Sequence, residues 1–136
     1  MSLQVRLRID FDDVHAVGPG KIALLERMRD CGSLSQAARE LDISYRRAWQ
    51  LLDSLNTSFN EPVIVTSVGG KGGGGSEITK LGLALIDTYR ALEDEVTALA
   101  QQRFKPLRTS VAPVTAQRRA ITKLARGKRG RGSKRT

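Results

Sequence analysis

The sequence has little of what disulfide frameworks, metal sites and membrane spans require. Its 136 residues include one cysteine, Cys31, and one histidine, His15. A single cysteine excludes an intramolecular disulfide, and no basic segment followed by an apolar run marks a secretory leader, so we expect a cytoplasmic protein. No apolar stretch approaches the roughly 18 residues of a membrane span, and we expect no membrane partner.

The lone cysteine and histidine predict no chemistry. Cys31 is expected to be a small core residue at a helix end, because no histidine motif accompanies it. His15 lies near Asp10, Asp12 and Asp13, whose spacing matches no pattern of metal ligands, so we expect a solvated loop. We therefore predict no catalytic residue, no metal site and no cofactor, and we do not expect an enzyme.

Acidic residues are missing from one part of the chain. Residues 103–136 contain 12 Lys/Arg and no Asp/Glu, whereas residues 1–102 contain 11 Lys/Arg and 14 Asp/Glu. Such a basic block repels itself and attracts polyanions, either nucleic acid or an anionic membrane, and composition alone does not separate the two. We expect a folded domain over residues 1–104 and a disordered basic tail over residues 105–136.

Hydrophobic periodicity predicts that the folded domain is α+β. Apolar residues alternate with polar ones from Leu3 to Ile9, which predicts a strand with one buried face. Helical stripes, caps and stop signals predict three helices, over residues 19–31, from Leu34 to about Leu41, and from Tyr45 to about Ser58. Two strands are predicted at residues 63–68 and 77–79, followed by a long helix that begins near Lys80.

The second and third predicted helices have the form of a helix-turn-helix. Ser33 begins a capping box with Gln36, and Ser44 caps the third helix after a three-residue turn. An ordinary helical hairpin has the same form, but the outward face of the third helix carries arginines and a glutamine, which pair with guanine and adenine, and hydroxyls that suit phosphates. The predicted DNA surface comprises Ser33, Ser35, Gln36, Ser44, Tyr45, Arg46, Arg47 and Gln50. Trp49, at the margin of this face, is expected to cover the core.

The glycine-rich stretch VGGKGGGGSEIT, residues 68–79, has three interpretations: a linker, including an engineered spacer, a phosphate-binding loop, or a segment that contacts nucleic acid. A Walker loop needs Ser or Thr after its lysine, but Lys71 is followed by Gly72. A hairpin that follows a helix-turn-helix is the wing of a winged helix. Glycines would let the wing approach a sugar-phosphate surface, and Lys71 and Ser76 are added to the predicted DNA surface.

The long helix carries a heptad seam. Leu85, Tyr89, Leu92, Val96 and Leu99 follow one another at intervals of four, three, four and three residues. The seam packs either on the chain's own domain or on a helix of a second subunit.

The segment GSLSQAARELDISYRRAWQLLDSLN, followed by GGKGGGG and ITKLG, resembles the DNA-binding domain of the ModE family of molybdate-responsive regulators, which is similar to the LysR-type winged helix-turn-helix. The resemblance covers residues 19–100, and the family carries such a glycine tract naturally. It implies that the third helix enters the major groove, that Lys71 approaches an adjacent groove or the backbone, and that the first and last helices form a dimer. The predicted interface comprises Leu24, Met28, Leu85, Tyr89, Leu92, Val96 and Leu99.

This sequence departs from the family after Leu107. Full-length ModE proteins continue into oxyanion-binding domains rich in strands, whereas a basic tail follows here. We therefore expect no molybdate sensor in this chain, and a separate effector-sensing protein is a further candidate partner.

These features predict a winged helix-turn-helix with a long C-terminal dimerisation helix. The expected function is a homodimeric, sequence-specific transcription regulator, with a link to molybdenum metabolism, that binds a pseudo-palindromic operator in double-stranded DNA. The alternative is an architectural, nucleoid-associated protein that binds DNA with little sequence preference through its tail; a small oxyanion-binding protein would need a pocket. The tail residues expected to contact DNA are Arg118, Arg119, Lys123, Arg126, Lys128, Arg129 and Arg131.

Overall fold

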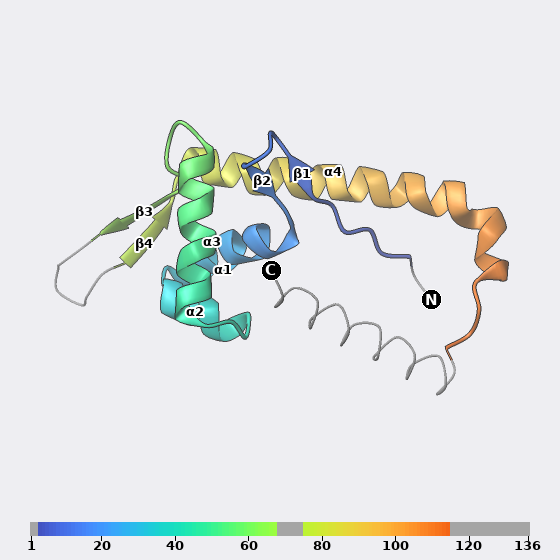
Figure 1. The fold of residues 1–136 in the computed structure, drawn as a ribbon, viewed down its shortest axis with the longest axis horizontal. Coiled ribbons are helices and arrows are strands. Elements are labelled where there is room, and N and C mark those ends of the chain that lie inside the picture. The colour runs from blue at the N-terminus through green and yellow to red at the C-terminus, as the bar shows by residue number, and fades with distance from the viewer. Residues whose placement is uncertain (1–2, 68–74, 115–136) are drawn as a thin grey trace. The chain divides into compact units, whose positions relative to one another are not determined.

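The structure, a computed structural model, describes residues 3–67 and 75–114. Two short strands precede three helices, which are followed by a two-stranded hairpin and a long helix (Figure 1). The elements are β1 (Ile9–Asp10), β2 (Ala16–Val17), α1 (Pro19–Cys31), α2 (Leu34–Glu40), α3 (Tyr45–Ser58), β3 (Ile64–Ser67), β4 (Gly75–Ile78), α4 (Lys80–Phe104) and the 3-10 helix η1 (Lys105–Ser110). This order confirms the predicted α+β winged helix-turn-helix.

The core forms where α1, α2 and α3 pack on one another. Their buried side chains follow the helical period, so each helix presents one apolar stripe inward. These residues are Ile22, Leu24, Leu25 and Met28 of α1, Leu34, Ala37 and Ala38 of α2, and Ala48, Leu52 and Leu55 of α3. Val63, Ile64, Ile86 and Tyr89 extend the same cluster to the hairpin and α4.

Serine caps set the start of α2 and of α3, as predicted. The Ser33 Oγ accepts a hydrogen bond from the Gln36 N–H at 3.2 Å, and the Ser44 Oγ accepts one from the Arg47 N–H at 3.0 Å. The other half of the expected capping box is wrong, because the Gln36 amide oxygen accepts from Arg39 at 2.7 Å. Between the caps Asp42 adopts φ 55°, a left-handed conformation that aspartate tolerates, and this residue turns the chain from α2 to α3.

The wing is an antiparallel hairpin at the end of α3. β3 and β4 pair in the register Ile64↔Ile78, Val65↔Glu77, Thr66↔Ser76 and Ser67↔Gly75. The return strand β4 therefore begins at Gly75, before the predicted start at residue 77. Residues 68–74, with Lys71 among them, lie outside the described residues.

Gly82 allows α4 to pack closely against the hairpin. A Cβ at this position would lie 2.6 Å from the Ile78 Cγ1 and would also clash with the Val63 carbonyl oxygen. We expect Gly82→Ala to lower the free energy of unfolding by about 1–3 kcal/mol, the usual cost of overpacking. Urea denaturation measures the difference.

Gly20→Ala is the matched control, because nothing lies within 4 Å of a Cβ at Gly20 in the first turn of α1. This variant should be as stable as the wild type or slightly more stable. Equal midpoints for the two variants would contradict the close approach at Gly82.

The predicted strand over residues 3–9 is wrong in its extent. Only Ile9 and Asp10 are bonded in a ladder, with Val17 and Ala16 as partners. Residues 3–8 keep the alternation between half-buried apolar and exposed polar side chains, but they have no strand assignment. The Tyr89 hydroxyl donates to the Leu7 carbonyl at 2.7 Å, which fixes this N-terminal segment to α4.

Contacts divide the chain into Met1–Gln102 and Arg103–Thr136. In the second unit, Lys105–Ser110 form η1, so the disorder predicted from residue 105 is wrong for these residues. The seven tail residues predicted to contact DNA, and the disorder predicted for them, lie outside the described residues. The boundary between residues 104 and 105 stays a prediction.

Cys31 is exposed at the end of α1, which corrects its assignment to the core. Its thiol donates to the Ser33 carbonyl at 3.3 Å. Gly32 adopts φ 67° and ends α1 directly after Cys31.

Candidate nucleic-acid interface

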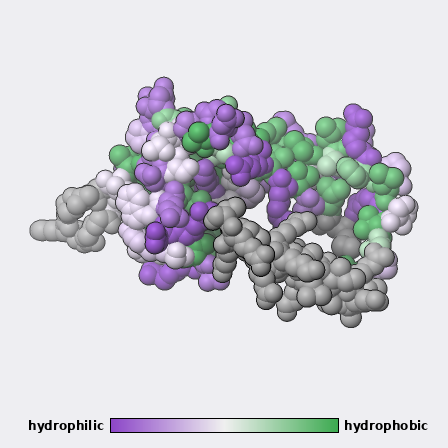
Figure 2. All heavy atoms as spheres, in the orientation of Figure 1, coloured by the Kyte–Doolittle hydropathy of each residue, from purple (hydrophilic) through white to green (hydrophobic). Residues whose placement is uncertain are grey.

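The outward face of α3 presents the polar side chains that the sequence predicted for DNA contact. Ala48, Leu52 and Leu55 face the core, and the opposite side of the helix is open to solvent. Figure 2 shows mainly hydrophilic side chains over α3. The exposed members of the predicted surface on and just before this helix are Ser44, Tyr45, Arg46, Arg47 and Gln50.

The positive charges of this face are not neutralised by neighbouring acids. Within residues 3–67 and 75–114, neither Arg46 nor Arg47 forms an ion pair. No acidic residue lies in the first turn of α3, where the helix dipole would favour one. Cations at a helix N-terminus are unfavourable alone, and a bound anion removes that penalty.

The residues of the predicted surface in and just before α2 differ in solvent exposure and in the hydrogen bonds that they already make. Ser35 is exposed, whereas Ser33 and Gln36 are half-buried and already take part in the capping hydrogen bonds of α2. DNA contact by Ser33, Ser35 and Gln36 remains a prediction. Trp49 is 47% exposed at the edge of α3 and is not among the described hydrophobic residues packed against the core, which corrects the expectation that it covers the core.

Asn56, which sequence analysis missed, fixes the wing to α3. Its side-chain oxygen accepts from the Val63 N–H at 2.9 Å, and its amide donates to the Ile64 carbonyl at 3.3 Å. The Ser76 backbone N–H donates to the Gly32 carbonyl at 3.0 Å and so fixes β4 to the end of α1. An asparagine near a helix end is a weak local signal, because its partners are known only after folding.

A second group of cations lies beside α3. The Lys21 Nζ, in the first turn of α1, donates to the Ala16 carbonyl at 2.7 Å. Burial lowers the Lys21 pKa, and the positive charges of Arg8 and Arg47 lower it further. Three basic side chains from distant parts of the sequence therefore act on one another electrostatically, which no local pattern could predict.

The predicted dimer residues are divided by the fold. Leu24, Met28 and Tyr89 are buried in the chain's own core, at 0%, 2% and 3% exposure, so the prediction that they contact a partner is corrected. Leu92 and Leu99 are exposed, whereas Leu85 and Val96 are half-buried. The exposed residues of the predicted interface are therefore Leu92 and Leu99, both beyond the buried start of α4.

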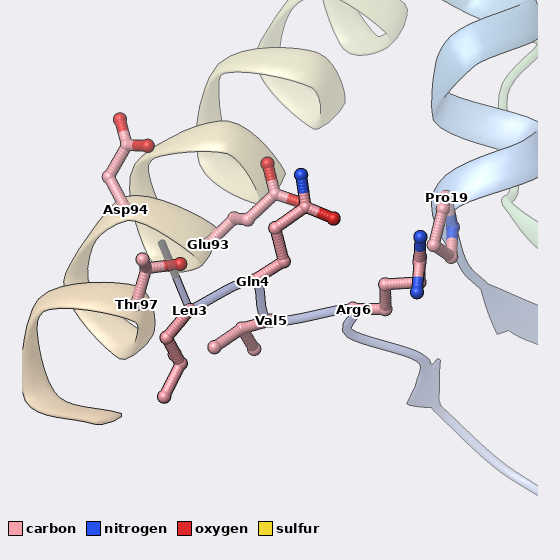
Figure 3. Close-up of a pocket in the computed structure, with 8 residues that line it drawn as sticks. All are labelled: Leu3, Gln4, Val5, Arg6, Pro19, Glu93, Asp94 and Thr97. Carbon is pink, nitrogen blue, oxygen red and sulfur yellow. The ribbon is translucent and has the colours of Figure 1, made fainter. Parts of the chain in front are cut away.

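A shallow pocket of roughly 310 Å³ lies between the N-terminal segment and α4 (Figure 3). Glu93, Asp94 and Thr97 form its α4 side, and Figure 3 shows Glu93 directed toward Gln4. The lining holds two carboxylates, from Glu93 and Asp94, against the single cation Arg6, and the excess negative charge repels an anion. This pocket does not suit an oxyanion such as molybdate.

The acidic group around His15 is a local turn. The Asp12 carboxylate accepts from the backbone N–H groups of His15 and Val14 and from the His15 ring, and these hydrogen bonds lower the Asp12 pKa to about 2. No group of three potential metal ligands occurs in the described ranges. None of the helices within those ranges is long and apolar enough to cross a bilayer.

Comparisons with known proteins identify relatives in sequence. The chain is 31% identical over 125 residues to a "Transcriptional regulator ModE" of Yersinia pestis, an alignment that covers 92% of this chain and 46% of the relative. It is 32% identical over 138 residues to the "Molybdenum transport protein ModE" of Azotobacter vinelandii, covering 91% of this chain and 51% of that protein. The chain thus spans about half the length of these curated relatives. It matches no protein-family model.

A solved structure shows the same fold. MepR, a transcription regulator of the Staphylococcus aureus multidrug efflux pump MepA, superposes with a TM-score of 0.53 at 13% identity. The match covers 85% of this chain and 79% of MepR. At this identity the likeness supports the architecture alone.

Proposed function

We propose that this chain, a homologue of the ModE transcriptional regulators with a ModE-like winged helix-turn-helix domain, is a transcription regulator that binds double-stranded DNA in a sequence-specific manner. One observation carries the proposal: the N-terminal half of α3 exposes two arginines without ion pairs in the described chain, next to Gln50 and beside a wing. Arginine and glutamine are the side chains that make paired hydrogen bonds to guanine and adenine in the major groove.

The proposed active form is a homodimer joined through α4. The buried residues of α4 are Gly82, Ile86 and Tyr89, all in its first ten residues. Beyond them the helix keeps the heptad leucines Leu92 and Leu99, which no part of the described chain buries, and Figure 2 shows hydrophobic side chains along α4. A two-fold dimer would place two α3 helices on half-sites about 34–36 Å apart in a pseudo-palindromic operator.

Selection from random genomic fragments tests sequence-specific binding. The full-length protein should enrich one pseudo-palindrome at roughly physiological salt, because specific binding typically exceeds nonspecific binding by 10³-fold or more. Equal recovery of all fragments would instead favour an architectural protein that coats DNA. The observation that favours this second candidate is the run of 12 basic and no acidic residues over 103–136.

A link to molybdenum rests on the names of relatives, such as the molybdenum transport protein of A. vinelandii. We propose that the regulated genes, rather than a site in this chain, provide that link. Molybdate should then leave the thermal melting temperature unchanged. A rise that saturates with molybdate concentration would show direct binding and would contradict this proposal.

A further inference from the structure

The N-terminal segment and α1 carry cations that the proposed recognition surface leaves unexplained. Arg8 lies on the exposed side of the segment, where its one ion pair is with Asp10 at 2.8 Å and both side chains are exposed. Lys21 is tied to the Ala16 carbonyl in the first turn of α1. Figure 3 shows Arg6 directed toward Pro19, where α1 begins.

The β1–β2 ladder, with Ile9 opposite Val17, places Arg8 beside the entry to α1, where Lys21 bonds to the Ala16 carbonyl. Each residue of an α-helix advances by about 100°, so Arg47 lies beside the buried stripe of Ala48 and not at the centre of the exposed face. Figure 1 shows the wing on one side of α3 and the segment that leads into α1 on the other. Arg47 therefore lies at the border of the recognition face, and its charge acts on Lys21.

Gathering three like charges costs free energy unless an anion meets them. Neither Lys21 nor Arg47 has an acidic partner within the described residues, and neither α1 nor α3 has an acid in its first turn. Burial and the charges of Arg8 and Arg47 both disfavour the charged form of Lys21. The negative charge of a phosphate beside these groups would instead favour the charged form of Lys21.

We propose that Arg8, Lys21 and Arg47 form a phosphate-binding surface, the flanking basic cluster, which holds the DNA backbone on the side of α3 opposite the wing. This inference rests on the proposed function, because a DNA duplex docked on α3 is what brings phosphates to the cluster. With the wing on one side and the cluster on the other, both backbones that border the groove are contacted. Phosphate contacts of this kind fix the position of the recognition helix without selecting bases.

Two neutral variants of the full-length protein, Lys21→Gln and Arg8→Gln, test the cluster. Binding is measured by fluorescence anisotropy on the selected duplex and on a scrambled duplex of the same length, at several salt concentrations. Each variant should weaken binding to both duplexes by the same factor, roughly three- to tenfold, and should reduce the slope of log affinity against log salt by about 0.9. The ratio of the two affinities should not change.

Arg27→Gln is the matched control. Arg27 is exposed on the same helix as Lys21 but about 120° away around it, near Glu26 and Arg90. This variant removes the same charge and should leave the affinity within twofold of the wild type. Lys21→Gln loses the hydrogen bond to the Ala16 carbonyl, so thermal melting checks that this variant still folds. Arg8→Gln removes a side chain that, among the described residues, bonds to the Asp10 carboxylate and not to the backbone, so it tests the cluster without that risk.

The outcomes separate this inference from the proposed function. If the wild-type protein prefers one sequence but Lys21→Gln and Arg8→Gln bind DNA as well as Arg27→Gln does, the proposed phosphate-binding cluster is overturned and specific regulation is not. If the wild-type protein shows no sequence preference but the two variants still weaken its DNA binding, specific regulation is overturned and the cluster is supported. If the wild-type protein does not bind DNA, both proposals are overturned. A changed affinity ratio would assign these residues to base recognition instead. Stabilisation by inorganic phosphate at constant ionic strength, lost in Lys21→Gln, would assign the cluster to a free oxyanion and also overturn it.

Discussion

Replacing Arg46 and Gln50 together by alanine should abolish the preference for the selected operator while leaving nonspecific DNA binding almost intact. Both side chains are exposed one helical turn apart on the outward face of α3. A paired hydrogen bond to the correct base contributes about 1–3 kcal/mol of discrimination. Two such contacts in each half-site would supply several kcal/mol, so we expect operator affinity to fall at least 100-fold, toward that of a scrambled duplex.

The measurement is a competition between operator and scrambled duplex at fixed salt. The double variant should fold normally, because neither side chain is buried and alanine has the highest helix propensity. Arg27→Gln is again the control for loss of positive charge. An unchanged ratio of affinities in the double variant would show that α3 does not carry recognition, whatever the total affinity.

The order of elements was predictable because its signals are local. Ser33 and Ser44 stand at the N-caps of α2 and α3, and the predicted caps are confirmed because a hydroxyl and an N–H three residues later meet in any helix start. Apolar stripes likewise predicted which faces are buried. These inferences need only the backbone geometry of one element.

The errors occurred where the partner of a surface had to be inferred. Alternation from Leu3 to Ile9 shows that one side of the segment is covered, but it does not show whether a neighbouring strand bonds its backbone; here residues 3–8 lie against α4 instead. Leu24 and Met28 have the same periodicity whether α1 packs on its own core or on a second subunit. Periodicity indicates burial and leaves the covering element unspecified.

The flanking basic cluster was missed for a related reason. Arg8 lies just before β1, Lys21 in α1 and Arg47 in α3, and none of them stands out within its own stretch of sequence. The tail drew attention because its 12 basic residues fall within one segment, residues 103–136, with no acidic residue among them. Charges brought together by tertiary structure become visible only when helices and segments are placed in space.

Substituting Leu92 and Leu99 by glutamate should convert the protein to a monomer and lower its operator affinity by roughly two orders of magnitude or more. The two leucines are 36% and 50% exposed, so glutamate is tolerated in the isolated chain, but four carboxylates would then meet in a dimer seam. Covalently or stably linked modules gain about 10²–10⁴ in affinity because the second contact is intramolecular, and a monomer forfeits that gain. Sedimentation at two concentrations and operator titration measure both effects.

Leu83→Glu provides the control for this seam. Leu83 is 40% exposed on the same helix, but it precedes Leu92 by nine residues and therefore lies about 180° around the helix from it. The same substitution there adds the same charge without entering the seam, so Leu83→Glu should remain dimeric and bind the operator normally. If Leu83→Glu dissociates the protein as readily as the seam variant does, the interface lies on another face of α4. If neither variant changes the sedimentation coefficient of a wild-type dimer, the two subunits meet elsewhere, and the exposed leucines of α4 must be covered by a different partner.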